Sequence, residues 1–156
     1  MNDNESLMLK IQIRNKALKY FGGRPNLVLD MFAGECVITK MLWRGISNHV
    51  ICIEKDEKKP TKVDGVDLII GDNRDYIDLA YDADIIDCDA YGLVLGLIEK
   101  LPSKKVVVFT DGTPVKSRKV FNAEIEFHKK LKEIFSFHEV IKNPSETAYY
   151  GWGVTK

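Results

Sequence analysis

The sequence predicts an α/β protein built on a mostly parallel sheet with helices on both faces. Two observations predict it. Short apolar segments rich in Val, Ile and Leu alternate with segments whose apolar residues recur at helical spacing, which is typical of strands joined by covering helices. The last two strand-like segments are separated only by a short turn around Asn143-Pro144-Ser145, so they should pair antiparallel.

Seven segments have the composition of strands. The first, Leu27 to Met31, is apolar except for one aspartate, as expected of a buried strand. The others are residues 49–54, 66–70, 83–87, 105–110, 136–141 and 147–154. We expect a seven-stranded sheet with an antiparallel C-terminal strand.

The segments between the strands are expected to be helices. Leu7, Ile11 and Leu18 fall at helical spacing, which predicts an amphipathic helix near residues 5–21 that ends at Gly22-Gly23. Further helices are expected at residues 37–45, 73–79 and 91–101, and in a longer segment whose Phe127, Leu131, Ile134 and Phe135 share one face.

Length and composition limit the possible functions. A chain of 156 residues suits one domain, residues 1–156, and 45% apolar with 29% charged residues suits a soluble globule. Basic and acidic residues number 23 each, so a nucleic-acid partner would need a local basic patch. No apolar run is long enough for a membrane span, and the acidic N-terminus is unlike a secretory signal. The separated Cys36, Cys52 and Cys88 favour a cytoplasmic protein without a metal site.

Acidic residues stand at the ends of four predicted strands: Asp30, Glu54, Asp72 and Asp87, with Asp89 close behind. Because the carboxyl ends of parallel strands share one edge of the sheet, these acids should converge on one crevice. Each also has an ordinary alternative. Asp30 and Asp72 could cap the following helices, and Glu54 could be one more solvated charge in a charged loop.

The positions of two acids favour a nucleoside ligand. Glu54 follows an apolar strand directly, and a carboxylate there could accept hydrogen bonds from both hydroxyls of a ribose. Asp72 follows the next strand and could accept a hydrogen bond from an adenine amino group, with Asn73 nearby.

The segments Leu-Asp-Met-Phe-Ala-Gly-Glu-Cys, Ile-Glu-Lys-Asp, Gly-Asp-Asn and Asp-Cys-Asp-Ala-Tyr-Gly resemble, in this order, the motifs of class I S-adenosylmethionine-dependent methyltransferases. The resemblance spans nearly the whole chain and implies a Rossmann-like methyltransferase fold with S-adenosylmethionine as cofactor. It implies that the first turn approaches the methionine part, that Glu54 holds the ribose and that Asp72 holds the adenine. The cofactor-binding residues it implies are Asp30, Phe32, Ala33, Gly34, Cys36, Glu54, Lys55, Asp72, Asn73 and Asp87.

One position departs from the family pattern. The family usually has Gly-x-Gly in the first turn, and here the second glycine is Cys36. Glycine permits close approach of the backbone to a ligand, so the cysteine must either narrow the pocket or turn its side chain away. The same change weakens a rival interpretation as a nicotinamide-binding enzyme, because Gly34-x-Cys36 followed by Lys40 does not make Gly-x-Gly-x-x-Gly.

The segment from Ile86 to Gly92 is similar to the catalytic loop of tRNA N2,N2-dimethylguanosine methyltransferases, with Ala90 in place of a proline. An exocyclic base amine is a poor nucleophile because its lone pair is delocalised into the ring. A carboxylate that accepts a hydrogen bond from the N–H group of this amine would localise the lone pair and direct it at the methyl donor. Asp89 is the candidate acceptor, with Asp87 nearer the cofactor, and Tyr91 could stack on the base or pack inward.

We therefore expect a methyltransferase acting on a base nitrogen of nucleic acid, RNA more than DNA. The basic segment at residues 113–119 is a better candidate for phosphate contacts than the basic segment at residues 100–105. Tyr149, Tyr150 and Trp152 could stack on bases or fill the core. One alternative is a methyltransferase for a protein or small molecule, with a partner subunit supplying recognition. Another is a catalytically silent scaffold subunit.

Overall fold

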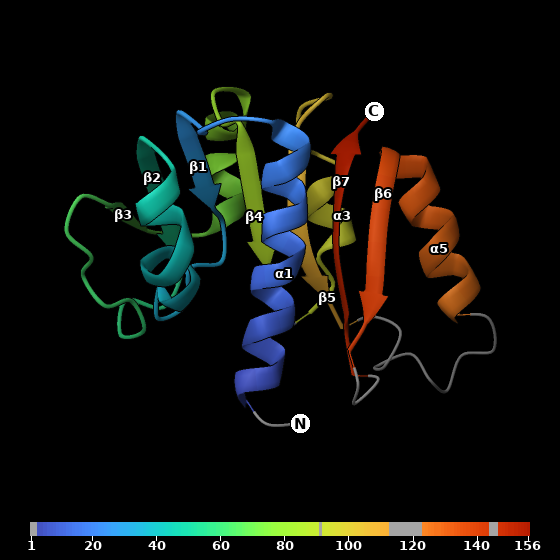
Figure 1. Cartoon of the computed structure of the whole chain (residues 1–156), viewed down its shortest axis with the longest axis horizontal. Helices are drawn as coiled ribbons and strands as arrows, with labels where there is room; N and C mark the ends of the chain where they lie inside the picture. Colours follow the sequence, from blue (N-terminus) through green and yellow to red (C-terminus); the bar gives the residue numbers. More distant parts are fainter. Residues whose placement is uncertain (1–2, 91, 113–122, 144–146) are drawn as a thin grey trace.

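The computed structural model describes residues 3–90, 92–112, 123–143 and 147–156. Its seven strands form one sheet in the order β3-β2-β1-β4-β5-β7-β6 (Figure 1). The five strands β1 to β5 run parallel to one another, and β7 runs antiparallel to both β5 and β6. The fold is thus the predicted Rossmann-like arrangement with an antiparallel C-terminal strand.

The strands are β1 (Leu27–Asp30), β2 (His49–Glu54), β3 (Asp67–Ile70), β4 (Ile85–Asp89), β5 (Val106–Asp111), β6 (Phe135–Lys142) and β7 (Tyr149–Thr155). The helices are α1 (Asp3–Phe21), α2 (Arg44–Ile46), α3 (Leu95–Ile98) and α5 (Ala123–Ile134), with a π-helical turn η1 (Thr39–Trp43) and a 3-10 segment η2 (Asn73–Tyr81). None of these described helices combines the length and the apolar character that a membrane span requires.

Three predicted helices are less regular than expected. The segment at 37–45 contains the π-helical turn η1, which places Thr39 and Trp43 on one buried face. The segment at 73–79 is a 3-10 helix, and among the described residues 92–101 only Leu95–Ile98 is α-helical. Phe135, expected on the face of the last helix, instead begins β6 and stacks on Phe109 with 5.6 Å between ring centroids. Apolar spacing alone does not separate these short turns from α-helix.

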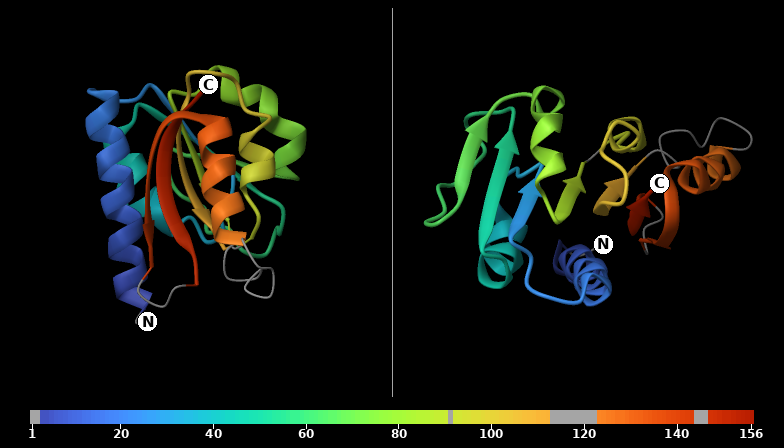
Figure 2. Two further views of the ribbon diagram at one scale, coloured as in Figure 1. Left: turned by 90° about the vertical axis from the view of Figure 1, so that its right-hand side faces the viewer. Right: turned by 90° about the horizontal axis from the view of Figure 1, so that it is seen from above.

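Each face of the sheet carries its own apolar core. On one face Ile13 and Ala17 of α1 and Trp43 of η1 cover alternate residues of the central strands. On the other face η2, α3 and α5 pack against the residues in between, with Phe127 and Leu131 among the buried ones. Viewed from above, α1 lies on one side of the sheet and α3 and α5 lie on the other (Figure 2). The amphipathic segments are therefore where the doubly wound pattern requires them.

The strand directions bring the predicted acids to one edge. The carboxyl ends of β1, β4 and β5 lie at the lower edge of the sheet in Figure 1, and Asp30 pairs in register with Asp87. β4 begins two residues later than predicted, so Asp87 and Asp89 both belong to the strand itself. Residues two apart in a strand point to the same face, so both carboxylates face α1.

Candidate active site

The turn after β1 is held by the carboxylate of Asp30. This side chain is buried and accepts hydrogen bonds from the hydroxyl of Thr39 at 2.8 Å and from the backbone N–H of Phe32 at 3.3 Å. Burial, and then the negative charge of Asp87, raise the pKa of Asp30 to about 7. Asp30 therefore holds the turn at the end of β1 with a carboxyl group that is partly protonated near pH 7.

Two residues of this turn have left-handed backbone conformations, Gly34 with φ 52° and Cys36 with φ 58°. The conformation at Cys36 explains why glycine is the usual residue there, because an L side chain adopts it at a cost. Of the two possibilities for the cysteine, the structure takes the second, since its side chain is buried in the core beneath the turn. The backbone N–H of Cys36 donates a hydrogen bond to the carbonyl oxygen of Ala33 at 2.7 Å. Apart from its two chain neighbours, no described heavy atom lies within 4 Å of the position that a Cβ on Gly34 would take, so the space beside Gly34 is open.

Glu54 ends β2 and reaches across to the turn. One carboxylate oxygen accepts the backbone N–H of Gly34 at 2.9 Å, and the other accepts the N–H of Asp56 at 2.9 Å. Each oxygen has a second lone pair free of these two bonds. Two backbone amides therefore fix a half-buried carboxylate at the junction of two pockets, both of which it lines together with Phe32.

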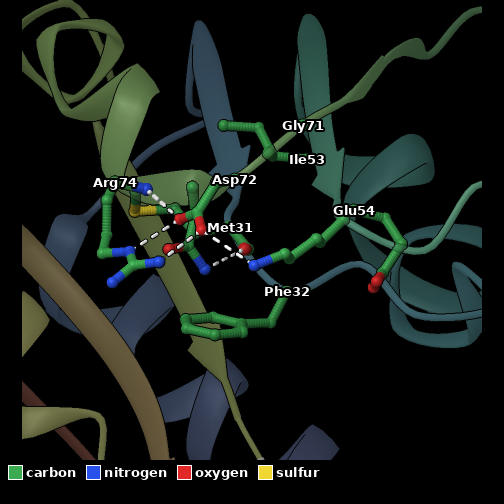
Figure 3. Close-up of a pocket in the computed structure, with 9 residues that line it drawn as sticks. Met31, Phe32, Ile53, Glu54, Gly71, Asp72 and Arg74 are labelled. Atoms are coloured by element: carbon green, nitrogen blue, oxygen red, sulfur yellow. Dashed lines mark hydrogen bonds and ion pairs between the residues drawn. The ribbon is translucent and has the colours of Figure 1, made fainter.

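The smaller pocket, of about 230 Å³, lies at the carboxyl ends of β1, β2 and β3 (Figure 3). Its walls are apolar at Met31, Phe32 and Ile53, and Asp72 stands at its polar end. The side chain of Asn73 does not face a ligand freely, because it donates to the carbonyl of Met31 at 3.1 Å. An apolar slot with a carboxylate at one end suits a flat heterocycle that carries an amino group.

Asp72 is held by cations in this structure. The guanidinium of Arg74 donates to its two oxygens at 2.9 and 2.6 Å, and the ammonium of Lys55 donates at 3.2 Å. The hydrogen bonds from Arg74 are the largest cause that lowers the pKa of Asp72 below its usual range. Both basic side chains extend into solvent, so they can move without unfolding any element.

The larger pocket has a volume of about 810 Å³ and lies between the first turn, the end of β4 and the N-terminal half of α1. Asp30, Ala33 and Gly34 line it on one side, and Asp87 and Asp89 line it on the other. With Phe32 and Glu54, seven of the predicted residues therefore share this crevice.

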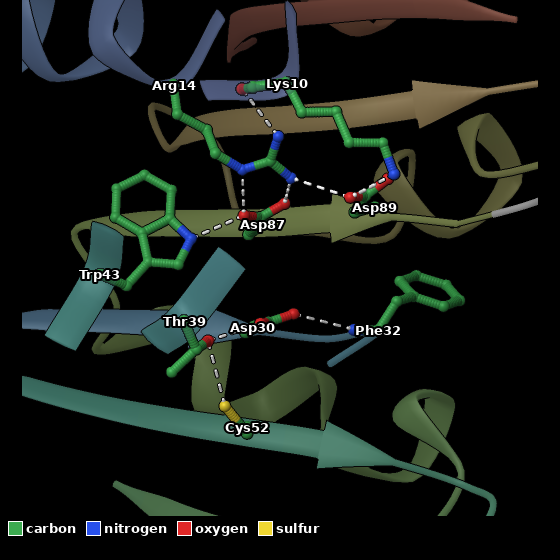
Figure 4. Close-up of polar contacts among 9 residues, drawn as sticks. All are labelled: Lys10, Arg14, Asp30, Phe32, Thr39, Trp43, Cys52, Asp87 and Asp89. Atoms are coloured by element: carbon green, nitrogen blue, oxygen red, sulfur yellow. Dashed lines mark hydrogen bonds and ion pairs between the residues drawn. The ribbon is translucent and has the colours of Figure 1, made fainter. Parts of the chain in front are cut away.

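Asp87 is the anchor of a buried ion pair (Figure 4). Its two oxygens accept from Nη2 and Nε of Arg14, each at 2.7 Å, and one also accepts from the indole Nε1 of Trp43 at 2.6 Å. Both Asp87 and Arg14 are 1% exposed. Three donors already use this carboxylate, and through them Asp87 fixes α1 and η1 to β4. Its predicted place beside the cofactor stays a prediction.

Asp89 is the more accessible acid, with a side chain 12% exposed. Its Oδ2 atom lies 2.8 Å from the ammonium of Lys10 and 3.3 Å from Nη2 of Arg14 (Figure 4). Burial alone would raise the pKa of Asp89, but Arg14 and then Lys10 hold it below its usual value. The carboxylate is therefore charged and faces the crevice.

Sequence reasoning missed Arg14, Lys10 and Trp43. The signal for Arg14 is present in the sequence, since it stands on the apolar stripe of α1, three residues after Ile11 and four before Leu18. A charged residue in such a stripe indicates a buried partner. The partner itself lies 73 residues away, and periodicity cannot identify it.

Several predicted residues have a different status. Tyr91 and residues 113–119 lie outside the described residues. Ala90 is buried and Gly92 lines the larger pocket. Tyr149, Tyr150 and Trp152 are all buried, so they fill the core as one of the two interpretations proposed. Lys55 reaches Asp72 and lines the smaller pocket.

Solved structures share this fold. An N-methyltransferase, NodS, from Bradyrhizobium japonicum has a TM-score of 0.63 at 9% identity, with 99% of each chain covered. A Streptococcus mutans protein described as a SAM-dependent methyltransferase has a TM-score of 0.59 at 13% identity, covering 92% of this chain and 48% of that one. SMU.776, described as a methyltransferase and solved with SAH, has a TM-score of 0.56 at 13% identity, with the same coverage.

The chain thus spans about half the length of two of these neighbours and nearly all of the third. No family model matches the sequence, and no curated protein matches it. The strand order, the strand directions and the structural neighbours agree at the level of the fold: the chain has the Rossmann-like fold of methyltransferases.

Proposed function

We propose that this protein is an S-adenosylmethionine-dependent methyltransferase. The observation that carries the proposal is the position of Glu54 at the junction of the two pockets. A nucleoside whose ribose hydroxyls bind Glu54 would place its base in the slot beside Asp72 and its 5′ substituent in the crevice beside Asp30 and Asp89. The neighbours described as methyltransferases, one of them solved with SAH, support the same cofactor.

The residues present fit this cofactor by their chemistry. Glu54 has acceptor capacity for a diol, and Met31, Phe32 and Ile53 give the slot apolar walls for an adenine. Asp72 can accept the adenine amino group where Arg74 and Lys55 yield one of its oxygens. The side chains of Arg74 and Lys55 are 66% and 74% exposed, so they can release Asp72 to a ligand without a change in the fold.

The bound cofactor would supply a methyl group activated by a sulfonium. The work of the protein is then to present a nucleophile in line with that methyl group. We propose that Asp89 accepts a hydrogen bond from the N–H group of an amine substrate and so localises the nitrogen lone pair. Arg14, held by Asp87, fixes the position of Asp89 from behind, and Tyr91 is proposed to stack on the base.

The substrate we propose is a base nitrogen of nucleic acid, RNA more than DNA. The similarity of the segment from Ile86 to Gly92 to the loop of tRNA N2,N2-dimethylguanosine methyltransferases supports it. The structural neighbour NodS, described as an N-methyltransferase, supports transfer to nitrogen. A protein or small-molecule amine is the alternative within the same chemistry, with a partner subunit supplying recognition. Three buried free cysteines support a cytoplasmic location.

One observation favours a second candidate, a silent scaffold subunit. In the described structure the carboxylates of Asp72 and Asp89 are both occupied by basic side chains of the protein itself. A site that has lost its ligand could close in this way. The two candidates differ in cofactor binding, so binding decides between them.

The test is calorimetric titration of S-adenosylmethionine and SAH into the wild type and Asp72→Ala. The methyltransferase proposal expects saturable binding to the wild type that is strongly weakened in the variant, which should fold normally because Asp72 lies at the surface. The second step is transfer of labelled methyl groups to unmodified tRNA and to duplex DNA. Asp89→Ala should abolish transfer while SAH binding survives. Absence of binding to the wild type would favour the scaffold.

A further inference from the structure

The larger pocket is rich in carboxylates. Its lining includes five acidic residues: Asp30, Glu35, Glu54, Asp87 and Asp89. Under the proposed function it would also receive the amino-acid end of the cofactor, which carries a carboxylate of its own. A further anion among these acids would be repelled unless a cation of the protein met it.

Three basic residues line the same pocket in the described part of the chain: Lys10, Arg14 and Lys59. Arg14 is buried, and its nitrogens Nε, Nη1 and Nη2 all donate within the protein, to Asp87 and to the carbonyl of Lys10. Lys59 is exposed in the loop after β2. Lys10 lines the crevice with a side chain that is 15% exposed, and its ammonium is paired with the carboxylate of Asp89 at the crevice wall.

We propose, on the basis of the proposed function, that Lys10 binds the carboxylate of the cofactor's amino-acid part and thereby releases Asp89 for the substrate. Lysine suits this role because its ammonium is a compact charge with three donors on a flexible stem. In the described structure this ammonium lies 2.8 Å from Oδ2 of Asp89 (Figure 4). Exchanging one carboxylate partner for another leaves the charge of Lys10 compensated throughout.

The exchange would couple loading of the cofactor to exposure of the amine acceptor. Without the cofactor, Oδ2 of Asp89 is shared by Lys10 and Arg14, so an incoming N–H group competes with two cations. With Lys10 drawn to a second carboxylate, Asp89 keeps the fixed Arg14 and regains acceptor capacity. The cofactor should therefore bind before the substrate.

The first experiment compares two ligands that differ only in the amino-acid part, SAH and 5′-methylthioadenosine, by titration calorimetry. Lys10→Met should weaken SAH by about 10- to 100-fold, as expected for a lost charge-assisted hydrogen bond, and leave methylthioadenosine within about twofold. Lys10→Arg should retain most of the SAH affinity, and Lys59→Met should change neither ligand. Equal effects of Lys10→Met on both ligands, or selective loss in Lys59→Met, would overturn the proposal.

The second experiment tests the shared partner. If Asp89 competes for Lys10, Asp89→Asn should tighten SAH binding by a few fold in the wild-type background and have no effect in the Lys10→Met background. An equal change in both backgrounds, or weaker binding in the first, would contradict the coupling. Failure of the wild type to bind either adenosine ligand is a different outcome, because it refutes the proposed function together with this inference.

Discussion

Two groups of carboxylates and cations line the two neighbouring pockets, one group in each, and they differ in burial. Asp72 with Arg74 and Lys55 lies at the surface, and the two basic side chains are 66% and 74% exposed. Asp87 with Arg14 lies in the core, and both side chains are 1% exposed. Each carboxylate accepts a guanidinium through both oxygens, so the chemistry is the same and only the surroundings change.

The difference in burial gives the two groups different uses. An exposed ion pair contributes little to stability and can exchange a protein cation for a ligand. A buried pair contributes little relative to an apolar replacement, but removal of one partner leaves an uncompensated charge in the core. We therefore expect the group at Asp72 to serve binding and the group at Asp87 to hold the frame.

The largest expected effect is the loss of the buried partner. Arg14→Met leaves Asp87 in the core with the indole of Trp43 as its remaining side-chain donor, and Asp89 loses one cation. We expect the free energy of unfolding to fall by about 3–5 kcal/mol, measured by urea denaturation. Arg74→Met is the matched control, and it should leave the denaturation midpoint unchanged. The double variant Arg14→Met/Asp87→Asn should recover part of the loss.

The contrast between the two groups fails if Arg14→Met and Arg74→Met have similar midpoints. It also fails if Arg74→Met unfolds the protein, because that would make the surface group part of the frame.

The next effect is a pH dependence carried by Asp30. Its pKa is raised from 3.8 to about 7 in the folded protein, so between these values the folded state binds more protons than the unfolded state. The free energy of unfolding should therefore decrease as the pH rises through this interval, by about 4 kcal/mol at most from this group.

Asp30→Asn removes the titration and keeps a side-chain acceptor for Thr39. The free energy of unfolding of the wild type should fall relative to that of the variant as the pH rises from 4 to 7, and the difference should then stay constant. Both free energies are measured at several pH values. A constant difference across this range would show that Asp30 is charged throughout. Subtraction of the two curves cancels the titrating groups that do not interact with Asp30, including His138, whose pKa is lowered by burial.

The smallest effect concerns Cys36. Cys36→Gly relieves a left-handed conformation, worth roughly 1 kcal/mol, but empties a small buried volume. Stability should change by no more than about 1 kcal/mol, because these two terms are of similar size and opposite sign. SAH affinity should remain within about twofold, because the thiol points into the core. A tenfold tighter complex in titration calorimetry would mean that the cysteine narrows the pocket.

The fold was predictable because its strands are buried on both faces and therefore appear as short apolar runs. The edge of the sheet at which the acids meet follows from strand direction alone. This is why Asp30, Glu54 and Asp72 lie near the predicted crevice. The irregular turns η1 and η2 were not predictable, since their apolar spacing is the same as that of short α-helices.

The frame of the site was not predictable for a different reason. Arg14 and Asp87 are far apart in the sequence, and no local pattern around either residue indicates its partner. The sequence pattern predicts Asp87 near the cofactor, and only the structure reveals the three donors that surround its carboxylate. Long-range pairing decides which of two neighbouring acids in a strand is available, and in β4 that residue is Asp89.

The most direct test of the account is titration of SAH into the wild type and Glu54→Gln, with Glu57→Gln from the same loop as control. Glutamine has one side-chain acceptor oxygen where glutamate has two, so it should bind a ribose diol about tenfold or more weakly. We predict saturable binding to the wild type and the control, and loss of at least this size in Glu54→Gln. Equal affinities for all three proteins, or no binding to the wild type, would contradict the assignment of Glu54 as the junction of the cofactor site.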